Sequence, residues 1–184
     1  VDNHPNRKYL RYLVLTSGRR IPVGGPLRAR MSEFTRQISR WATEVRKRYG
    51  IEVLYRGLEM TFDELDGSAH LHANVLIHPK RKLGDYWATA DTAHGWPDDS
   101  FLAFTKKKIG HKEEGETYTW HRDAGCIDQS EEIVKYITKP DDIENLDDDG
   151  LLWLYRELFG YPINESMGPF REFRHTLSDE KCKV

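Results

Sequence analysis

Two runs of alternating apolar and polar residues, separated by a short polar stretch, constrain the fold of this chain more than any other feature. The runs are IEVLYRGLEMTF at residues 51–62 and AHLHANVLI at residues 69–77, and the stretch between them contains Asp66-Gly67. Such alternation is typical of half-buried strands, and an Asp-Gly pair between two strands is a strong hairpin signal. We therefore expect the two runs to pair as neighbouring antiparallel strands.

A long amphipathic helix is predicted just before this hairpin. From Pro26 onward, apolar residues recur every three or four positions, and Gly50 stands where a C-terminal cap belongs. The apolar positions are Leu27, Met31, Phe34, Ile38, Trp41, Val45 and Tyr49. This spacing predicts a helix over residues 26–49 with one apolar side.

The remaining segments complete an α+β pattern. KYLRYLVLTS at residues 8–17 reads as a buried strand closed by Ser17-Gly18. The other predicted elements are a short helix at 97–108, a strand at 117–122, helices at 130–139 and around 151–158 with Leu151, Leu154, Tyr155 and Leu158 apolar, and a last strand in PFREFRHTL at 169–177. We expect one α+β domain over residues 1–184, with a central antiparallel sheet of about five strands and helices packed on it.

Composition excludes several classes of protein. No run of eighteen apolar residues could span a bilayer, and the first thirty residues carry charges and prolines where a signal peptide needs an apolar stretch. Two cysteines, Cys126 and Cys182, are too few for a disulfide framework. We expect a cytoplasmic protein with no membrane partner. The chain begins at Val1 without a methionine, which leaves open that it is a domain excised from a longer chain.

Positive charge is concentrated in the first fifty residues. The net charge of the chain is −2, yet residues 1–50 hold twelve Lys and Arg against three Asp and Glu. Arg28, Arg36 and Arg40 lie on the polar side of the predicted helix and are candidates for contact with a nucleic-acid backbone. The alternative is a solvated helix that is merely rich in arginine.

His70 and His72 form a candidate metal site. Alternate residues of a strand share one face, so both imidazoles project together while Leu71 points into the core. Pairing across the predicted hairpin sets Glu59 opposite a position between His70 and Asn74, on the histidine face, where it could be the third ligand of a divalent ion. The alternative is a pair of packed or surface histidines, which is common for an isolated His-x-His.

The predicted helix at residues 130–139 carries a second set of polar side chains. Glu132, Tyr136 and Lys139 are spaced by four and three residues, so they share one side of the helix. Ile133, Val134 and Ile137 cover the other side. A tyrosine between a carboxylate and an ammonium group suggests a catalytic role. The alternative is a half-buried tyrosine that serves only in packing.

Together these motifs resemble the HUH endonucleases, and among them the rolling-circle replication initiators of small bacterial plasmids. The resemblance covers YLVLTSG, RGLEMTFDELDGSAHLHANVLIH and EEIVKYITKP, in that order along the chain. It departs from many plasmid initiators at Asn74, where they have a further histidine. The resemblance implies that Glu59, His70 and His72 bind one Mg²⁺ or Mn²⁺, and that Tyr136 attacks single-stranded or hairpin origin DNA to form a 5′-phosphotyrosine. It also implies a host helicase and polymerase as further partners.

The resemblance gives roles to the two charged neighbours of Tyr136. Lys139 would favour the phenolate and offset charge in the transition state, and Glu132 would act as a general base that ends replication by hydrolysis. Glu132 could instead be a first-turn acid favoured by the helix dipole. Other readings are an HUH transposase or viral initiator, a metal-free DNA-binding module, and a histidine-metal hydrolase that forms no covalent intermediate.

Overall fold

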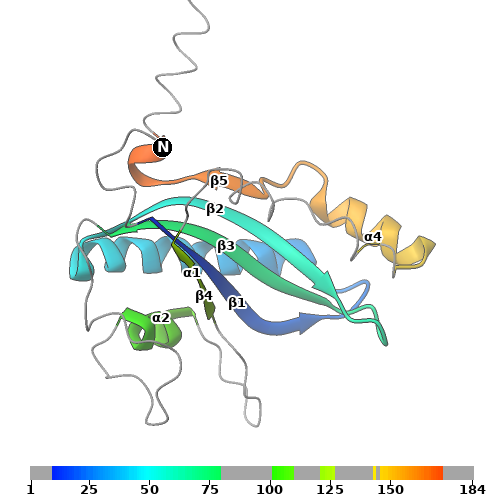
Figure 1. Cartoon of the computed structure of the whole chain (residues 1–184). Helices are drawn as coiled ribbons and strands as arrows, with labels where there is room; N and C mark the ends of the chain where they lie inside the picture. Colours follow the sequence, from blue (N-terminus) through cyan, green and yellow to red (C-terminus); the bar gives the residue numbers. More distant parts are fainter. Residues whose placement is uncertain (1–9, 80–100, 110–120, 127–142, 144–145, 172–184) are drawn as a thin grey trace, which may run out of the picture.

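The fold is one five-stranded antiparallel sheet with helices packed on it, which confirms the predicted α+β class (Figure 1). The computed structural model describes residues 10–79, 101–109, 121–126, 143 and 146–171. The strands are β1 (Arg11–Ile21), β2 (Ile51–Phe62), β3 (Ala69–Pro79), β4 (His121–Cys126) and β5 (Asn164–Ser166), and they lie in the order β4-β1-β3-β2-β5. The central strand of the sheet is therefore β3, which carries both histidines.

The hairpin of β2 and β3 has the register expected from the sequence. Phe62 faces Ala69 at the turn, and Glu59 faces His72 further along. The turn is closed by backbone hydrogen bonds in which the Gly67 amide donates to the Asp63 carbonyl at 2.9 Å and the Asp63 amide donates to the Ser68 carbonyl at 3.0 Å. Gly67 has φ 65°, a left-handed conformation that glycine adopts without strain.

Strand β1 is longer than predicted, because Ser17-Gly18 is an irregularity inside the strand and not its end. Thr16 pairs with His72 and Arg20 pairs with His70, so four steps along β1 match two steps along β3. Gly18 has φ 73° within this bulge. The bulge returns Arg20 to the side of the sheet that carries the histidines.

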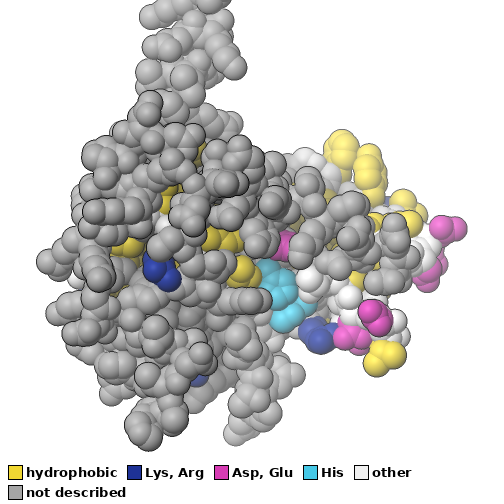
Figure 2. Space-filling view, in the orientation of Figure 1, with side chains coloured by type: hydrophobic (Ala, Val, Ile, Leu, Met, Phe, Trp, Pro, Cys, Tyr) yellow, Lys and Arg dark blue, Asp and Glu magenta, His cyan; other side chains and the backbone are white. Residues whose placement is uncertain are grey.

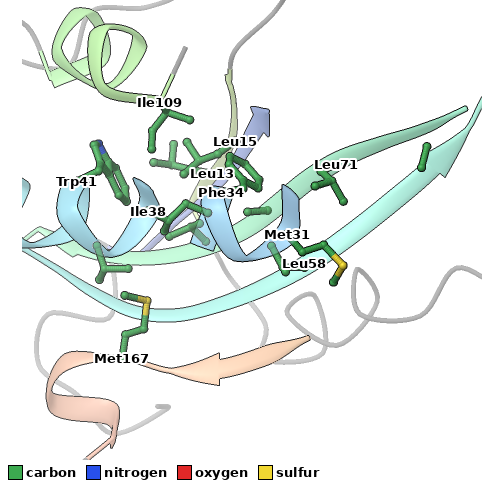
Figure 3. Close-up of a cluster of buried hydrophobic side chains, with 14 of the residues drawn as sticks. Leu13, Leu15, Met31, Phe34, Ile38, Trp41, Leu58, Leu71, Ile109 and Met167 are labelled. Atoms are coloured by element: carbon green, nitrogen blue, oxygen red, sulfur yellow. The ribbon is translucent and has the colours of Figure 1, made fainter. Parts of the chain in front are cut away.

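Helix α1 (Leu27–Tyr49) covers the other side of the sheet (Figure 1). Its buried residues are Leu27, Met31, Phe34, Ile38, Trp41 and Val45, as the apolar spacing predicted. Gly50 caps the helix with φ 66°, and its amide donates to the Arg46 carbonyl at 3.1 Å. Figure 3 shows this stripe against core residues of the sheet, among them Leu13, Leu15, Leu58 and Leu71. Full burial of each such side chain stabilises the fold by roughly 1.5–3 kcal/mol.

Helix α2 (Phe101–Ile109) packs against α1; it starts later than the short helix predicted at 97–108 and ends one residue beyond it. The Trp41 indole donates to the Thr105 hydroxyl at 3.0 Å, and the rings of Trp41 and Phe101 have centroids 6.1 Å apart. The strand predicted at 117–122 overlaps β4 only at its end, since β4 starts at His121 and the residues before it lie outside the described part.

The C-terminal part differs from the sequence prediction in two respects. Helix α4 (Asp148–Leu158) buries Trp153 and Leu154, whereas the expected core residues Leu151 and Tyr155 are 39% and 63% exposed. The Trp153 indole donates to the Gly25 carbonyl at 2.9 Å, and this contact sets the orientation of the helix.

The last strand within the described part is β5. The strand predicted at 169–177 is wrong for its first residues, because residues 168–171 are helical; residues 172–177 lie outside the described part. Pro169 explains the helical turn, because proline has no amide for a sheet hydrogen bond and its φ suits the first turn of a helix. No helix within the described ranges is long and apolar enough to cross a membrane.

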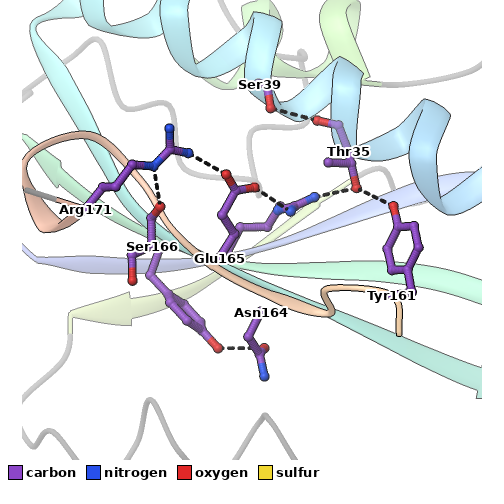
Figure 4. A network of polar contacts seen from close by, with 9 residues as sticks. Thr35, Ser39, Tyr161, Asn164, Glu165, Ser166 and Arg171 are labelled. Carbon is purple, nitrogen blue, oxygen red and sulfur yellow. Dashed lines mark hydrogen bonds and ion pairs between the residues drawn. The ribbon is translucent and has the colours of Figure 1, made fainter. Parts of the chain in front are cut away.

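A buried arginine, Arg56, ties β5 to the rest of the fold through a polar network that includes Thr35, Glu165 and Arg171 (Figure 4). Arg56 on β2 is 2% exposed and donates to the Glu165 carboxylate at 2.7 Å and to the Thr35 hydroxyl of α1. Burial lowers the pKa of Arg56, and the charge of Glu165 opposes that shift. Arg171 donates to the other oxygen of the same carboxylate. Glu165 thus neutralises a charge that the fold has removed from water.

Candidate metal and nucleic-acid site

The sheet has a second face, opposite α1, and this face carries the candidate site. Leu71, Ala73 and Val75 of β3 are buried with the α1 stripe, so the residues between them point the other way. We call this surface the histidine face; it consists of Thr16, Arg20, Glu59, Thr61, His70, His72 and Asn74. Figure 2 shows histidine side chains at the surface beside basic and acidic side chains.

The two histidines lie side by side, and a carboxylate faces them. The ring centroids of His70 and His72 are 4.6 Å apart and their planes make an angle of 63°. Glu59 of β2 is directly opposite His72, within the range that the sequence predicted, and Thr61 is opposite His70. Both histidines and Glu59 are half-buried. The structure thus brings the three predicted metal ligands onto one face of two adjacent strands.

Hydrogen bonds orient the side chains of His72 and Glu59. The Thr16 hydroxyl lies 3.1 Å from His72 Nδ1, and the Thr61 hydroxyl lies 3.3 Å from His72 Nε2. The Asn74 side-chain amide donates to Glu59 Oε2 at 2.7 Å, and Asn74 is only 1% exposed. By holding Oε2, the buried Asn74 amide fixes the direction of the other carboxylate oxygen of Glu59, as outer-shell partners of metal ligands do.

The donor types suit a divalent ion, but the side chains do not form a closed metal cage. Two imidazoles and one carboxylate match the ligand preferences of Mn²⁺ and Zn²⁺, and a carboxylate matches those of Mg²⁺. Within the described part of the chain, no group of three His, Cys, Asp or Glu side chains is arranged to hold a metal ion. Thr61 and Asn74 instead occupy His72 Nε2 and Glu59 Oε2. The strand positions and donor set fit the ion, and its binding would exchange the Thr61 contact for a metal bond.

The other end of the same face is apolar. Leu10, Tyr12 and Leu76 form a small buried cluster there, with Val14 and Tyr55 packed against it. Burial raises the pKa of Tyr55, which the charge of Arg56 opposes, and the Tyr55 hydroxyl donates to Asn164 at 2.7 Å. Tyr55 is therefore a neutral structural phenol at the apolar end of this face.

The predicted DNA-binding arginines do not lie with the histidines. Arg28, Arg36 and Arg40 belong to α1, which covers the opposite face of the sheet. Arg28 also has a structural role, because its backbone amide donates to the Glu157 carboxylate at 2.6 Å and its Nε donates to the Glu157 carbonyl at 3.0 Å. Arg36 and Arg40 are exposed. Arg36 and Arg40 could therefore contact a nucleic-acid backbone only on the α1 side of the molecule, opposite the histidine face.

The predicted tyrosine helix lies outside the described residues. Glu132, Tyr136 and Lys139 belong to residues 127–142, which the structure does not describe. Their roles stay predictions from the sequence.

The sequence reasoning did not anticipate Thr16, Arg20 or Thr61 as members of the face. Thr61 had a signal, because it is two positions from Glu59 and must share its face. Arg20 had none, since a bulge that changes register cannot be read from alternation.

Comparisons of the chain with known protein families, curated proteins and solved structures found no match. A function for the chain is therefore inferred from the geometry of the histidine face and the motifs of the sequence.

Proposed function

We propose that the chain nicks and joins single-stranded DNA in a metal-dependent reaction of the HUH type, and that this reaction initiates rolling-circle replication of a plasmid. One observation carries the proposal: His70 and His72 lie side by side on the central strand of a five-stranded antiparallel sheet, with Glu59 opposite His72. Packed structural histidines would not require a facing carboxylate whose direction is fixed by a buried Asn74.

Glu59, His70 and His72 would hold one Mg²⁺ or Mn²⁺. When bound, the ion supplies Lewis-acid polarisation of the scissile phosphate. Asn74 and Thr16 restrict Glu59 and His72 before the substrate arrives, so little side-chain freedom is lost on binding.

The covalent step is assigned to Tyr136. Its phenolic oxygen forms a bond to phosphorus, the bond from phosphorus to the 3′ oxygen breaks, and the leaving 3′ oxygen takes up a proton. The product is a 5′-phosphotyrosine, which conserves the phosphodiester energy for rejoining. An ordinary tyrosine has a pKa of about 10, so Lys139, three residues after Tyr136 on the predicted helix, would favour the phenolate.

Two other functions would give different experimental results. A metal-free DNA-binding module would use the arginines of α1 and would not depend on Tyr136. A histidine-metal hydrolase would cut DNA but form no covalent adduct. An HUH transposase or viral initiator would share the adduct and differ only in the DNA that it recognises.

The test is a denaturing gel of the protein incubated with Mn²⁺ and a labelled pool of random single-stranded oligonucleotides. A labelled band at the size of protein plus DNA is expected for the wild type, and none for Tyr136→Phe. Ala variants of Glu59, His70 and His72 should reduce the band by orders of magnitude while retaining the circular dichroism of the fold. Cleavage without a shifted band would favour the hydrolase, and binding without cleavage would favour the DNA-binding module.

A further inference from the structure

A groove of about 380 Å³ adjoins the histidine face at the turn of the β2–β3 hairpin. Arg20, Thr61, Asp63, Glu64, Leu65 and His70 contribute to its lining. This volume is in the range of pockets that hold small organic ligands. Because His70 belongs both to the groove and to the histidine face, a chain-like substrate bound at the histidines would continue into the groove.

The turn that forms one wall is held in place by its own carboxylates. Asp63 accepts a hydrogen bond from the Leu65 amide at 2.9 Å, and Asp66 accepts one from the Ser68 amide at 2.8 Å. These hydrogen bonds lower the pKa of both carboxyls, and in Asp66 the Ser68 hydroxyl contributes most. Both acids are therefore charged at neutral pH. An ordered turn presents its side chains at fixed positions, which favours binding.

Leu65 is the most exposed large apolar residue of the described part, at 97%. It stands on this ordered turn and contributes nothing to the core. An apolar side chain held in solvent beside a groove can pack on the ring of an unstacked base, as apolar wedges and stacking platforms do in other nucleic-acid-binding proteins.

The charge of the groove selects a base over a phosphate. Among the described residues that line the groove or its turn, Asp63, Glu64 and Asp66 supply three carboxylates, and the single cation, Arg20, is paired with Asp63. This surplus of negative charge repels phosphate. A carboxylate instead accepts hydrogen bonds from the N–H groups of an unpaired base. Guanine can donate both N1–H and its amino group to one carboxylate, whereas thymine donates only N3–H, and cytosine and adenine donate only from their amino groups.

We propose that this groove binds one unpaired base of the DNA strand near the nicked phosphate, with Leu65 against its ring and Glu64 accepting from its N–H groups. The inference rests on the proposed nicking activity and adds a position at which guanine is preferred. Glu64 is exposed and makes no contact that the fold requires, so its carboxylate is available to the base.

The experiment uses the full chain, Mn²⁺ and a pool of random single-stranded oligonucleotides. Protein–DNA adducts are isolated under denaturing conditions and the attached DNA is sequenced, together with uncleaved input. The wild type should prefer guanine roughly tenfold at one position near the nick. Glu64→Gln should weaken that discrimination at this position alone, and Leu65→Ser should lower adduct yield roughly tenfold for all bases there.

Matched controls come from exposed residues far from the groove. Glu44→Gln changes a surface glutamate of α1, and Leu152→Ala removes an exposed leucine of α4 that is 46% exposed. Both should leave yield and base preference as in the wild type.

The outcomes separate the two proposals. Adducts whose base preferences are the same in the wild type, Glu64→Gln and Leu65→Ser would overturn the base groove and leave the nicking activity standing. Absence of any adduct with the wild type would overturn both.

Discussion

Substitution of Asn74 gives the sharpest test of the metal site, because its side chain contacts the proposed ligand Glu59 and is not itself a proposed ligand. It is buried on β3, and its amide donates to Glu59 Oε2 at 2.7 Å. Asn74→Ala removes this donor and leaves Glu59, His70 and His72 unchanged in sequence. We expect the variant to fold and to bind Mn²⁺ more weakly.

The magnitude follows from the kind of hydrogen bond that is lost. A hydrogen bond to a charged group contributes about 1.5–3 kcal/mol. Loss of an outer-shell partner weakens metal affinity by roughly 10- to 100-fold, which corresponds to about 1.4–2.8 kcal/mol. The two ranges agree, so the dissociation constant for Mn²⁺ should rise within roughly that interval.

The assay is titration of the protein with Mn²⁺ in the absence of DNA, with free Mn²⁺ measured by electron paramagnetic resonance. Asn164→Ala is the matched control, because Asn164 also makes a side-chain hydrogen bond, to Tyr55, but lies on β5 without a contact to Glu59. Its Mn²⁺ affinity should stay close to that of the wild type.

Two results would refute this reasoning. An Asn74→Ala variant with unchanged Mn²⁺ affinity would show that orientation of Glu59 does not contribute to binding. A wild type that binds no Mn²⁺ would remove the metal site altogether. Thermal unfolding of the metal-free variants separates these results from a general loss of structure.

Three further predictions concern the buried arginine, the hairpin turn and the nucleophile helix. Glu165→Gln should lower the free energy of unfolding by about 1–3 kcal/mol in chemical denaturation, since it leaves Arg56 buried without its counter-charge. The pKa values of Asp63 and Asp66 are lowered in the folded protein, so these carboxylates stabilise the fold above the ordinary carboxyl pKa of about 4, and this stabilisation is lost as the pH falls further. Between pH 6 and pH 3, the melting temperature of an Asp63→Asn, Asp66→Asn double variant should therefore fall less than that of the wild type. Glu132→Ala should leave formation of the first adduct unchanged and slow its hydrolysis, measured in a two-step assay with a second cleavable oligonucleotide.

The parts of the fold that could be predicted are those that local pattern specifies. The stripe from Leu27 to Val45 predicted α1 and its buried side, and Asp66-Gly67 predicted the hairpin. The expected pairing set Glu59 opposite a position between His70 and Asn74, and its partner His72 lies within that range. In each case the sequence spacing determines the geometry directly.

The parts that could not be predicted depend on contacts between distant segments. The sequence around Ser17-Gly18 is compatible with a strand that ends there or continues through a bulge, and the pairing of β1 with β3 selects the bulge. The apolar side of α4 is chosen by the contact of Trp153 with Gly25, more than a hundred residues earlier in the chain. Leu151 and Tyr155 therefore looked like core residues although they are exposed.

Packing of the core also determines where the proposed metal ligands point. His70 and His72 point away from α1 only because Leu71 and Ala73 point toward it, and a register shift by one residue would bury the histidines under the helix. On β2 the same alternation places Leu58 in the core and Glu59 opposite His72. The geometry of the candidate site is thus set by hydrophobic packing on the other side of the sheet, which polar substitutions on the histidine face leave unchanged. This separation is why the proposed ligands can be tested one at a time in a protein that keeps its fold.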